Sequence, residues 1–134
     1  MASKGARRGV NRTGRSKSEG QYLALPYFMA RSDVFRSLTG PALKVWIELR
    51  TRFNGHNNGK VSLSLGEAAD LLHMSKSTAK RAFDELVAKG FLRLKTLGHW
   101  YGRKASEYVL TDVKIGEELA TRDWQNWRPP AEKK

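Results

Sequence analysis

The sequence predicts a mainly α-helical domain with a small β-hairpin, which is an α+β fold. Apolar residues recur with the period of a helix in ALKVWIELRTRF (42–53) and again in the run 76–89. Ser64 and Ser75 stand where helix N-caps are expected. The strand-like segments FLRLKTL and SEYVLT flank GHWYGRKA, and this arrangement indicates two paired strands.

Charge and composition divide the chain into three parts. Residues 1–21 hold six basic residues and one acidic residue with almost no large apolar side chain, so we expect a disordered basic arm. Residues 22–111 hold most of the apolar side chains and form the expected folded domain. Residues 112–134 form a carboxy-terminal extension that is expected to be partly helical, with a helix around Val113–Ala120 and a helix stop at Pro129.

The composition also narrows the class of partner. The 134 residues carry 25 Lys and Arg against 13 Asp and Glu, a formal charge of +12, which favours a polyanion. The longest apolar run, YLALPYFMA, contains Pro26 and is too short to span a membrane, so we expect no membrane partner. The chain has no cysteine, which excludes disulfides and thiolate chemistry. We expect a cytoplasmic, nucleoid-associated protein.

The first long helix is expected to begin at Gly40-Pro41, because proline is favoured in the first turn. It ends at NGHNNG (54–59), a run of turn-forming residues, and residues 60–63 follow as a short strand. The apolar stripe of this helix consists of Leu43, Trp46, Ile47, Leu49 and Phe53.

The next two helices are joined by a very short connection. Ser64 and Glu67 form a capping-box pattern, so a helix starts there and stops near His73. Ser75 caps the following helix, which runs over 76–89 and ends at a glycine C-cap. A three-residue connection is too short to let these two helices lie parallel, so we expect them to cross.

This order of helix, strand, helix, tight turn, helix and hairpin is that of a winged helix-turn-helix domain. SLGEAADLLHMSKSTAKRAFDELVAKGFL resembles the core pattern of this family, and the resemblance covers about residues 40–111. The chain is similar to bacterial regulators of the MarR or GntR type and to the amino-terminal domain of phage replication protein O. One departure is His73, where the turn usually has glycine; histidine tolerates a positive φ better than most residues.

The helix 76–89 is predicted to have a buried face and an opposite, DNA-facing one. Steps of 100° per residue place Ala79, Phe83, Leu86 and Val87 on one arc, the expected core face. The amino-terminal residues of a recognition helix reach base edges in the major groove, and Arg81 is the candidate for a bidentate contact with guanine. The predicted recognition residues are Lys76, Ser77, Thr78, Lys80 and Arg81.

Basic residues of the hairpin and the arm complete the predicted interface. We expect the hairpin, or wing, to lie on the DNA backbone or in the minor groove through Arg93, Lys95, His99, Trp100, Tyr101, Arg103 and Lys104. Trp100 is equally well explained as a cap of the core. The arm is expected to follow the backbone or enter the minor groove through Arg7, Arg8, Arg12, Arg15 and Lys17, with a solubilising extension as the alternative.

No catalytic, metal or cofactor site is expected. His56, His73 and His99 are isolated, and the sequence has no paired His–carboxylate spacing, Walker glycine loop or GxSxG motif. Trp124 and Trp127 leave two interpretations open. They form either a staple that folds the carboxy-terminal segment onto the domain or an exposed anchor for a protein partner or a second subunit in a homodimer.

The sequence therefore predicts a protein without enzymatic activity that binds double-stranded DNA with base preference, most simply as a bacterial, phage or plasmid transcriptional regulator. Two alternatives stay open. The first is an initiator of plasmid or phage replication that recognises an origin. The second is an RNA-binding or architectural protein, in which the arm dominates and the domain lacks base preference.

Overall fold

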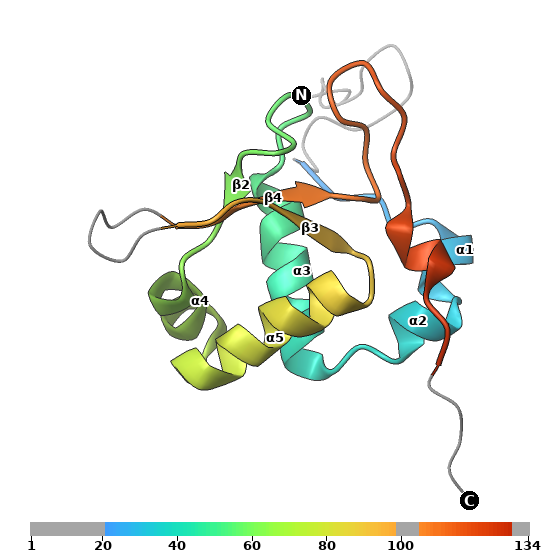
Figure 1. The fold of residues 1–134 in the computed structure, drawn as a ribbon. Helices are drawn as coiled ribbons and strands as arrows, with labels where there is room; N and C mark the ends of the chain where they lie inside the picture. The colour runs from blue at the N-terminus through green and yellow to red at the C-terminus, as the bar shows by residue number, and fades with distance from the viewer. Residues whose placement is uncertain (1–20, 99–104, 130–134) are drawn as a thin grey trace, which may run out of the picture.

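The computed structural model describes residues 21–98 and 105–129, which form a mixed α+β fold (Figure 1). These residues contain five α-helices and a three-stranded antiparallel sheet. The order of elements predicted for residues 40–111 is confirmed, whereas the two short amino-terminal helices are not apparent from sequence pattern. The elements are α1 (Tyr27–Ala30), α2 (Asp33–Arg36), α3 (Gly40–Arg52), β2 (Val61–Ser62), α4 (Leu65–Leu72), α5 (Lys76–Ala88), β3 (Leu92–Thr96), β4 (Glu107–Leu110) and the 3-10 helix η2 (Asp123–Asn126).

Helix α3 is the centre of the core. Thr39 caps its start by accepting a hydrogen bond from the backbone N–H of Ala42 at 3.3 Å, and Pro41 lies in the first turn as predicted. The placement of Ile47 in the buried stripe is wrong, because this side chain is 41% exposed. The buried residues of α3 are Ala42, Val45, Trp46 and Leu49.

The predicted caps of α4 and α5 are confirmed. The Ser64 hydroxyl accepts the backbone N–H of Glu67 at 3.0 Å, and the Glu67 carboxylate accepts the backbone N–H of Ser64 at 3.4 Å. His73 ends α4 in the left-handed conformation with φ at 58°. Ser75 then caps α5 by accepting the backbone N–H of Thr78 at 3.0 Å. The turn between the helices is therefore fixed at both of its ends.

One face of α5 is buried against the rest of the domain. Ala79, Phe83 and Leu86 are buried as predicted, and Ala82 joins them. The prediction for Val87 is wrong: its side chain is 41% exposed. Val87 lines an open hollow between α5 and the hairpin, and no element within residues 21–98 and 105–129 fills it.

The sheet has the strand order β2-β4-β3, and both pairings are antiparallel. Tyr108 in β4 pairs with Val61 on one side and Leu94 on the other. The ring of Phe83 stacks on the Tyr108 ring with centroids 5.2 Å apart, which joins α5 to the sheet. The predicted hairpin is confirmed as β3 and β4, while its tip (99–104) lies outside the described residues.

The carboxy-terminal segment takes a different form from the one expected. The predicted helix around Val113–Ala120 is wrong: here the chain forms a tight turn in which Ile115 pairs with Glu118. Gly116 occupies the turn with φ at 58°. Glycine takes this positive φ at no steric cost and is unfavourable inside a helix, so it favours the turn; the segment then continues into η2.

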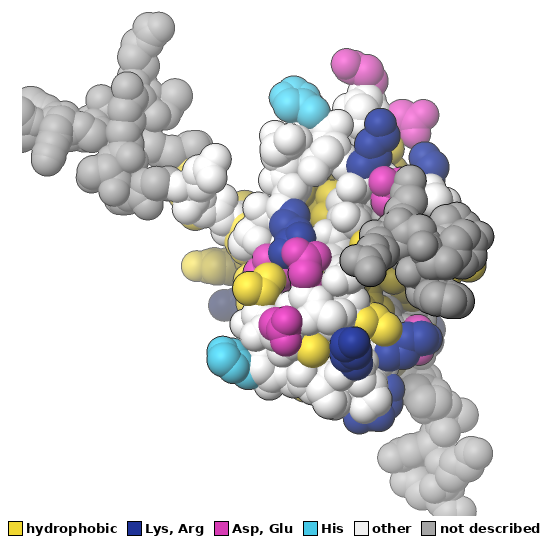
Figure 2. Space-filling model, turned by 90° about the vertical axis from the view of Figure 1, so that its left-hand side faces the viewer, with side chains coloured by type: hydrophobic (Ala, Val, Ile, Leu, Met, Phe, Trp, Pro, Cys, Tyr) yellow, Lys and Arg dark blue, Asp and Glu magenta, His cyan; other side chains and the backbone are white. Residues whose placement is uncertain are grey.

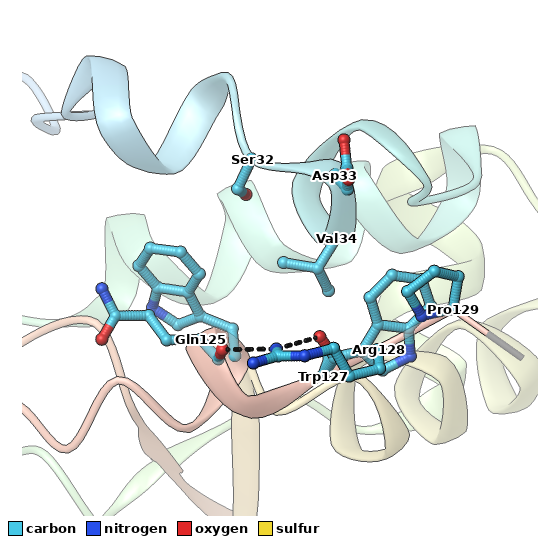
Figure 3. A pocket seen from close by; sticks show the side chains of 8 residues that line it. Ser32, Asp33, Val34, Gln125, Trp127, Arg128 and Pro129 are labelled. Carbon is cyan, nitrogen blue, oxygen red and sulfur yellow. Dashed lines mark hydrogen bonds between the residues drawn. The ribbon is translucent and has the colours of Figure 1, made fainter.

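Trp124 in η2 staples this segment to the domain. It is buried, and its ring stacks on Phe91 with centroids 6.0 Å apart, so Trp124 is not an exposed anchor for a partner. Gly90 allows the approach, because a Cβ there would lie 2.7 Å from the backbone of η2. Val34 of α2 points toward the segment across a hollow of about 420 Å³ that Trp127 also lines (Figure 3).

Candidate nucleic-acid interface

The start of α5 brings together the five recognition residues that the sequence predicts. Lys76, Ser77, Lys80 and Arg81 are exposed, and Thr78 is half-buried. Figure 2 is turned about the vertical axis, so heights in it correspond to those in Figure 1. Several Lys and Arg side chains lie near its lower edge, and Figure 1 shows the start of α5 at the same height. No acidic residue lies in the first turn of α5. This end of the helix therefore presents donors and positive charge to solvent.

Hydroxyl groups organise the first turn. Ser75 Oγ lies 2.9 Å from Thr78 Oγ1 and 3.1 Å from Ser77 Oγ. Thr78 Oγ1 in turn accepts a long hydrogen bond of 3.4 Å from Arg81 Nη2. The guanidinium group is thus held over the first turn. Within the described part of the chain it makes no other hydrogen bond, so its remaining N–H groups are available to a ligand.

Lys80 pairs with an acidic residue one turn later. Its Nζ lies 2.8 and 3.0 Å from the two carboxylate oxygens of Asp84. Both side chains are largely exposed, at 60% and 63%. An exposed pair of this kind contributes only about 0.3–0.5 kcal/mol, so Lys80 can exchange Asp84 for another anion at little cost.

The second half of α5 is bound to other elements of the domain. The Glu85 carboxylate accepts two hydrogen bonds from Thr39, one from the backbone N–H (3.0 Å) and one from the side-chain hydroxyl (2.7 Å). It accepts a third from Lys89 Nζ (2.8 Å). Burial acts to raise the pKa of Glu85, but these hydrogen bonds outweigh it and the pKa lies below its ordinary value. Lys89 also donates to the carbonyl of Ser37 at 3.0 Å and lies over the Trp127 ring.

The two described basic residues of the hairpin do not join the group on α5. Arg93 forms a bidentate ion pair with Asp123 in η2, with Nη2 to Oδ2 at 2.8 Å. Leu94 lines the hollow beside α5, so alternation along β3 turns Arg93 and Lys95 to the opposite face of the sheet. Lys95 is exposed there, with its Nζ near Gly59. The other predicted wing residues, His99, Trp100, Tyr101, Arg103 and Lys104, lie outside the described residues.

Positive charge is concentrated in the parts of the chain that the structure does not describe. Residues 21–98 and 105–129 hold 15 Lys and Arg against 11 Asp and Glu. The remaining segments hold ten basic residues against two acidic ones. The predicted arm residues Arg7, Arg8, Arg12, Arg15 and Lys17 belong to these segments and lie outside the described residues. The folded part is therefore only mildly basic, which makes the local grouping on α5 more informative than the net charge.

Thr39 and Pro41 are neighbours of this surface that sequence reasoning missed. Together with Thr78 and Arg81 they line an open hollow of about 520 Å³ between the start of α3 and α5. The order Thr-Gly-Pro is a recognisable helix start, so the cap itself was predictable. Its position beside Arg81 depends on how α3 packs on α5, which no local pattern encodes.

The described residues also bear on metal-binding clusters and on membrane-spanning helices. Over 21–98 and 105–129, no cluster of three or more His, Asp or Glu side chains is placed to bind a metal ion. None of the helices described is both long and apolar enough to cross a membrane. No protein-family model, curated protein or solved structure matches the chain.

Proposed function

We propose that the protein binds double-stranded DNA with base preference through the start of α5, as a winged helix-turn-helix transcriptional regulator. The observation that supports this most is the contrast between the two faces of α5. Ala79, Phe83 and Leu86 are buried on one face, while Ser77, Lys80 and Arg81 are exposed on the other. Side chains that the fold does not use are the ones available to a ligand.

The dimensions of α5 suit the major groove. A helix with its side chains is about 10–12 Å across, and the groove of B-DNA is about 12 Å wide. In the helix-turn-helix arrangement the amino-terminal residues of the second helix contact base edges. Here those residues are the hydroxyl-bearing first turn and Arg81, whose planar guanidinium matches the O6 and N7 acceptors of guanine.

Lys76 and Lys80 are the residues that we assign to the phosphate backbone. Lys76 has no hydrogen-bond or acidic partner in the described part of the chain, and its stem lies beside Gly66 in α4. Among the described residues, Lys80 pairs only with Asp84, and this surface pair is weak. We assign Arg93 a positioning role instead, because Asp123 already occupies its guanidinium group. It fixes the base of the hairpin against η2.

Selection from a random pool of duplexes tests this proposal. The full chain should enrich a short motif and bind it at least 1,000-fold more tightly than random duplexes, the usual lower bound for specific proteins. A plot of the logarithm of affinity against the logarithm of salt concentration should fall with a slope of about 0.9 for each phosphate that the protein neutralises. An unenriched pool, with equal affinity for selected and random duplexes, would contradict base-specific binding and favour an architectural role.

A further inference from the structure

An exposed aromatic surface lies on α1, far from the start of α5. Helix α1 has four residues and buries only Met29. Its other two large side chains face solvent: Tyr27 is 77% exposed and Phe28 is 50% exposed. Figure 1 places α1 at the right of the molecule and the start of α5 at the left. Neither ring belongs to the core or to the proposed duplex-binding surface.

An arginine lies over each of these rings. Arg31 Cζ is 5.1 Å from the centroid of the Tyr27 ring, and Arg122 Cζ is 5.1 Å from the centroid of the Phe28 ring. Neither guanidinium group has an ion pair with an acidic residue in the part of the chain that the structure describes. The surface therefore combines aromatic faces with unneutralised planar cations.

Arg122 occupies a strained backbone position. Its φ is 51°, in the left-handed region, where a residue other than glycine is uncommon and asparagine or aspartate are favoured. Its N–H donates to the Thr111 carbonyl at 2.7 Å, which holds the segment in place. Strained residues of this kind concentrate at functional sites, because the rest of the fold must compensate for them. The guanidinium group of this residue lies over Phe28.

We propose that α1, with Arg31 and Arg122, is a stacking platform for unpaired bases of a single-stranded nucleic acid. Sequence-tolerant single-strand sites combine aromatic rings with arginines and a positively charged path for the backbone. Phe28 also contacts Trp124, with ring centroids 5.7 Å apart, so it is partly covered and Tyr27 is the principal stacking residue. Arg31 and Arg122 supply the positive charge beside the two rings.

Charge favours this ligand over a second copy of the chain. A two-fold contact through α1 would bring together two patches that each carry Arg31 and Arg122. Opposed like charges on a protein with a net charge of +12 oppose such a contact, whereas a polyanion neutralises them. The platform does not depend on the proposed duplex reading by α5, and the two surfaces can be occupied at once.

Fluorescence anisotropy with a labelled oligo(dT) tests the platform on the full chain. Tyr27→Leu keeps an apolar side chain but removes the ring, so affinity should fall roughly 5- to 150-fold, the range that corresponds to 1–3 kcal/mol for one stacked base. Tyr27→Phe keeps the ring and should bind like the wild type. Because Tyr27 is mostly exposed, both variants should melt at the wild-type temperature. Arg81→Ala is the matched control from the other surface and should bind oligo(dT) unchanged.

Three results would overturn the platform. The first is absence of oligo(dT) binding by the wild type, and the second is equal binding by Tyr27→Leu and the wild type. The third is a wild-type dimer in sedimentation that Tyr27→Leu dissociates, which would make α1 a self-association surface. None of these results bears on duplex selection by α5, so failure of the platform and failure of the proposed function are distinguishable.

Discussion

The two halves of α5 have opposite environments. Near its start, the hydrogen bonds of Thr78, Lys80 and Arg81 go to residues of the same helix or its cap. Near its end, Glu85 binds Thr39 and Lys89 binds Ser37, which lie 46 and 52 residues earlier in the chain. The polar side chains of the first half therefore contribute little to tertiary structure, whereas those of the second half tie the helix to the rest of the domain.

This difference shows how the fold can hold binding side chains in fixed positions while their hydrogen-bonding groups stay available to a ligand. A helix that is clamped at one end and packed along one face presents the side chains of its other end in fixed positions. The partners of Arg81 and Lys80 are local and weak, so a ligand can replace them. Substitutions in the two halves should consequently separate stability from binding.

The largest effect is expected from Leu86→Ala. Leu86 is fully buried in the clamped half, and removal of a buried leucine costs about 2–5 kcal/mol of the free energy of unfolding. Urea denaturation measures this loss, and Leu86→Met should cost less than about 1.5 kcal/mol. Below its melting temperature, Leu86→Ala should still select the wild-type duplex motif. A changed motif in the folded variant would show that the two halves are not separable.

A smaller loss is expected from Glu85→Gln. The amide cannot pair with Lys89 as the carboxylate does, and hydrogen bonds to charged groups contribute about 1.5–3 kcal/mol, so the free energy of unfolding should fall by about 1–3 kcal/mol. Duplex affinity should not change. A wild-type unfolding curve for this variant would show that the negative charge of Glu85 does not stabilise the fold.

The same variant has a predicted pH signature. The pKa of Glu85 is lowered in the folded protein, so its stabilisation is present above the unfolded value, about 4.3, and is lost as pH falls through the folded value. The difference in stability between wild type and Glu85→Gln should therefore shrink in acid. Burial outweighs the neighbouring Arg50 and raises the pKa of Asp112, which acts in the opposite direction but is common to both proteins. A difference that stays constant from pH 7 to acid would contradict the role of the charge.

The smallest effect on stability is expected from Asp84→Asn. The exposed pair with Lys80 contributes at most about 0.5 kcal/mol, so unfolding should hardly change. Removal of the carboxylate frees Lys80 for a phosphate, so affinity for every duplex should rise and the salt slope should steepen by up to about 0.9. Glu117→Gln, in the turn before η2, makes the same change of charge as a control. Equal effects of the two variants would place Asp84 outside the interface.

Sequence patterns predicted the local features of the fold well. The caps at Ser64 and Ser75 and the left-handed His73 depend on neighbouring residues, and all three are found. Val87 could not be placed correctly, because its exposure depends on where the hairpin lies. Helices α1 and α2 have four residues each, too few to show a helical period. The turn at 115–118 was mistaken for a helix because Glu117 and Glu118 are good helix formers and Gly116 was given too little weight.

In the candidate site, as in the fold, local features were predictable from the sequence and tertiary contacts were not. The five residues at the start of α5 follow from the position of the cap and the helical period, and the structure brings them together. Arg93 looked equally available, but its partner Asp123 is thirty residues away and no sequence pattern connects them. The Tyr27 and Phe28 surface was also missed, because its arginines come from opposite ends of the chain.

Motif selection with Arg81→Ala and Lys89→Ala tests the central claim most directly, because the two residues represent the two halves of α5. Arg81→Ala should relax base preference at one position of the motif and cost on the order of 1–3 kcal/mol on the preferred duplex, with an unchanged melting temperature. Lys89→Ala should lower the melting temperature and select the wild-type motif. Selection of the wild-type motif by Arg81→Ala, or an altered motif with Lys89→Ala, would contradict the assignment of DNA reading to the start of α5.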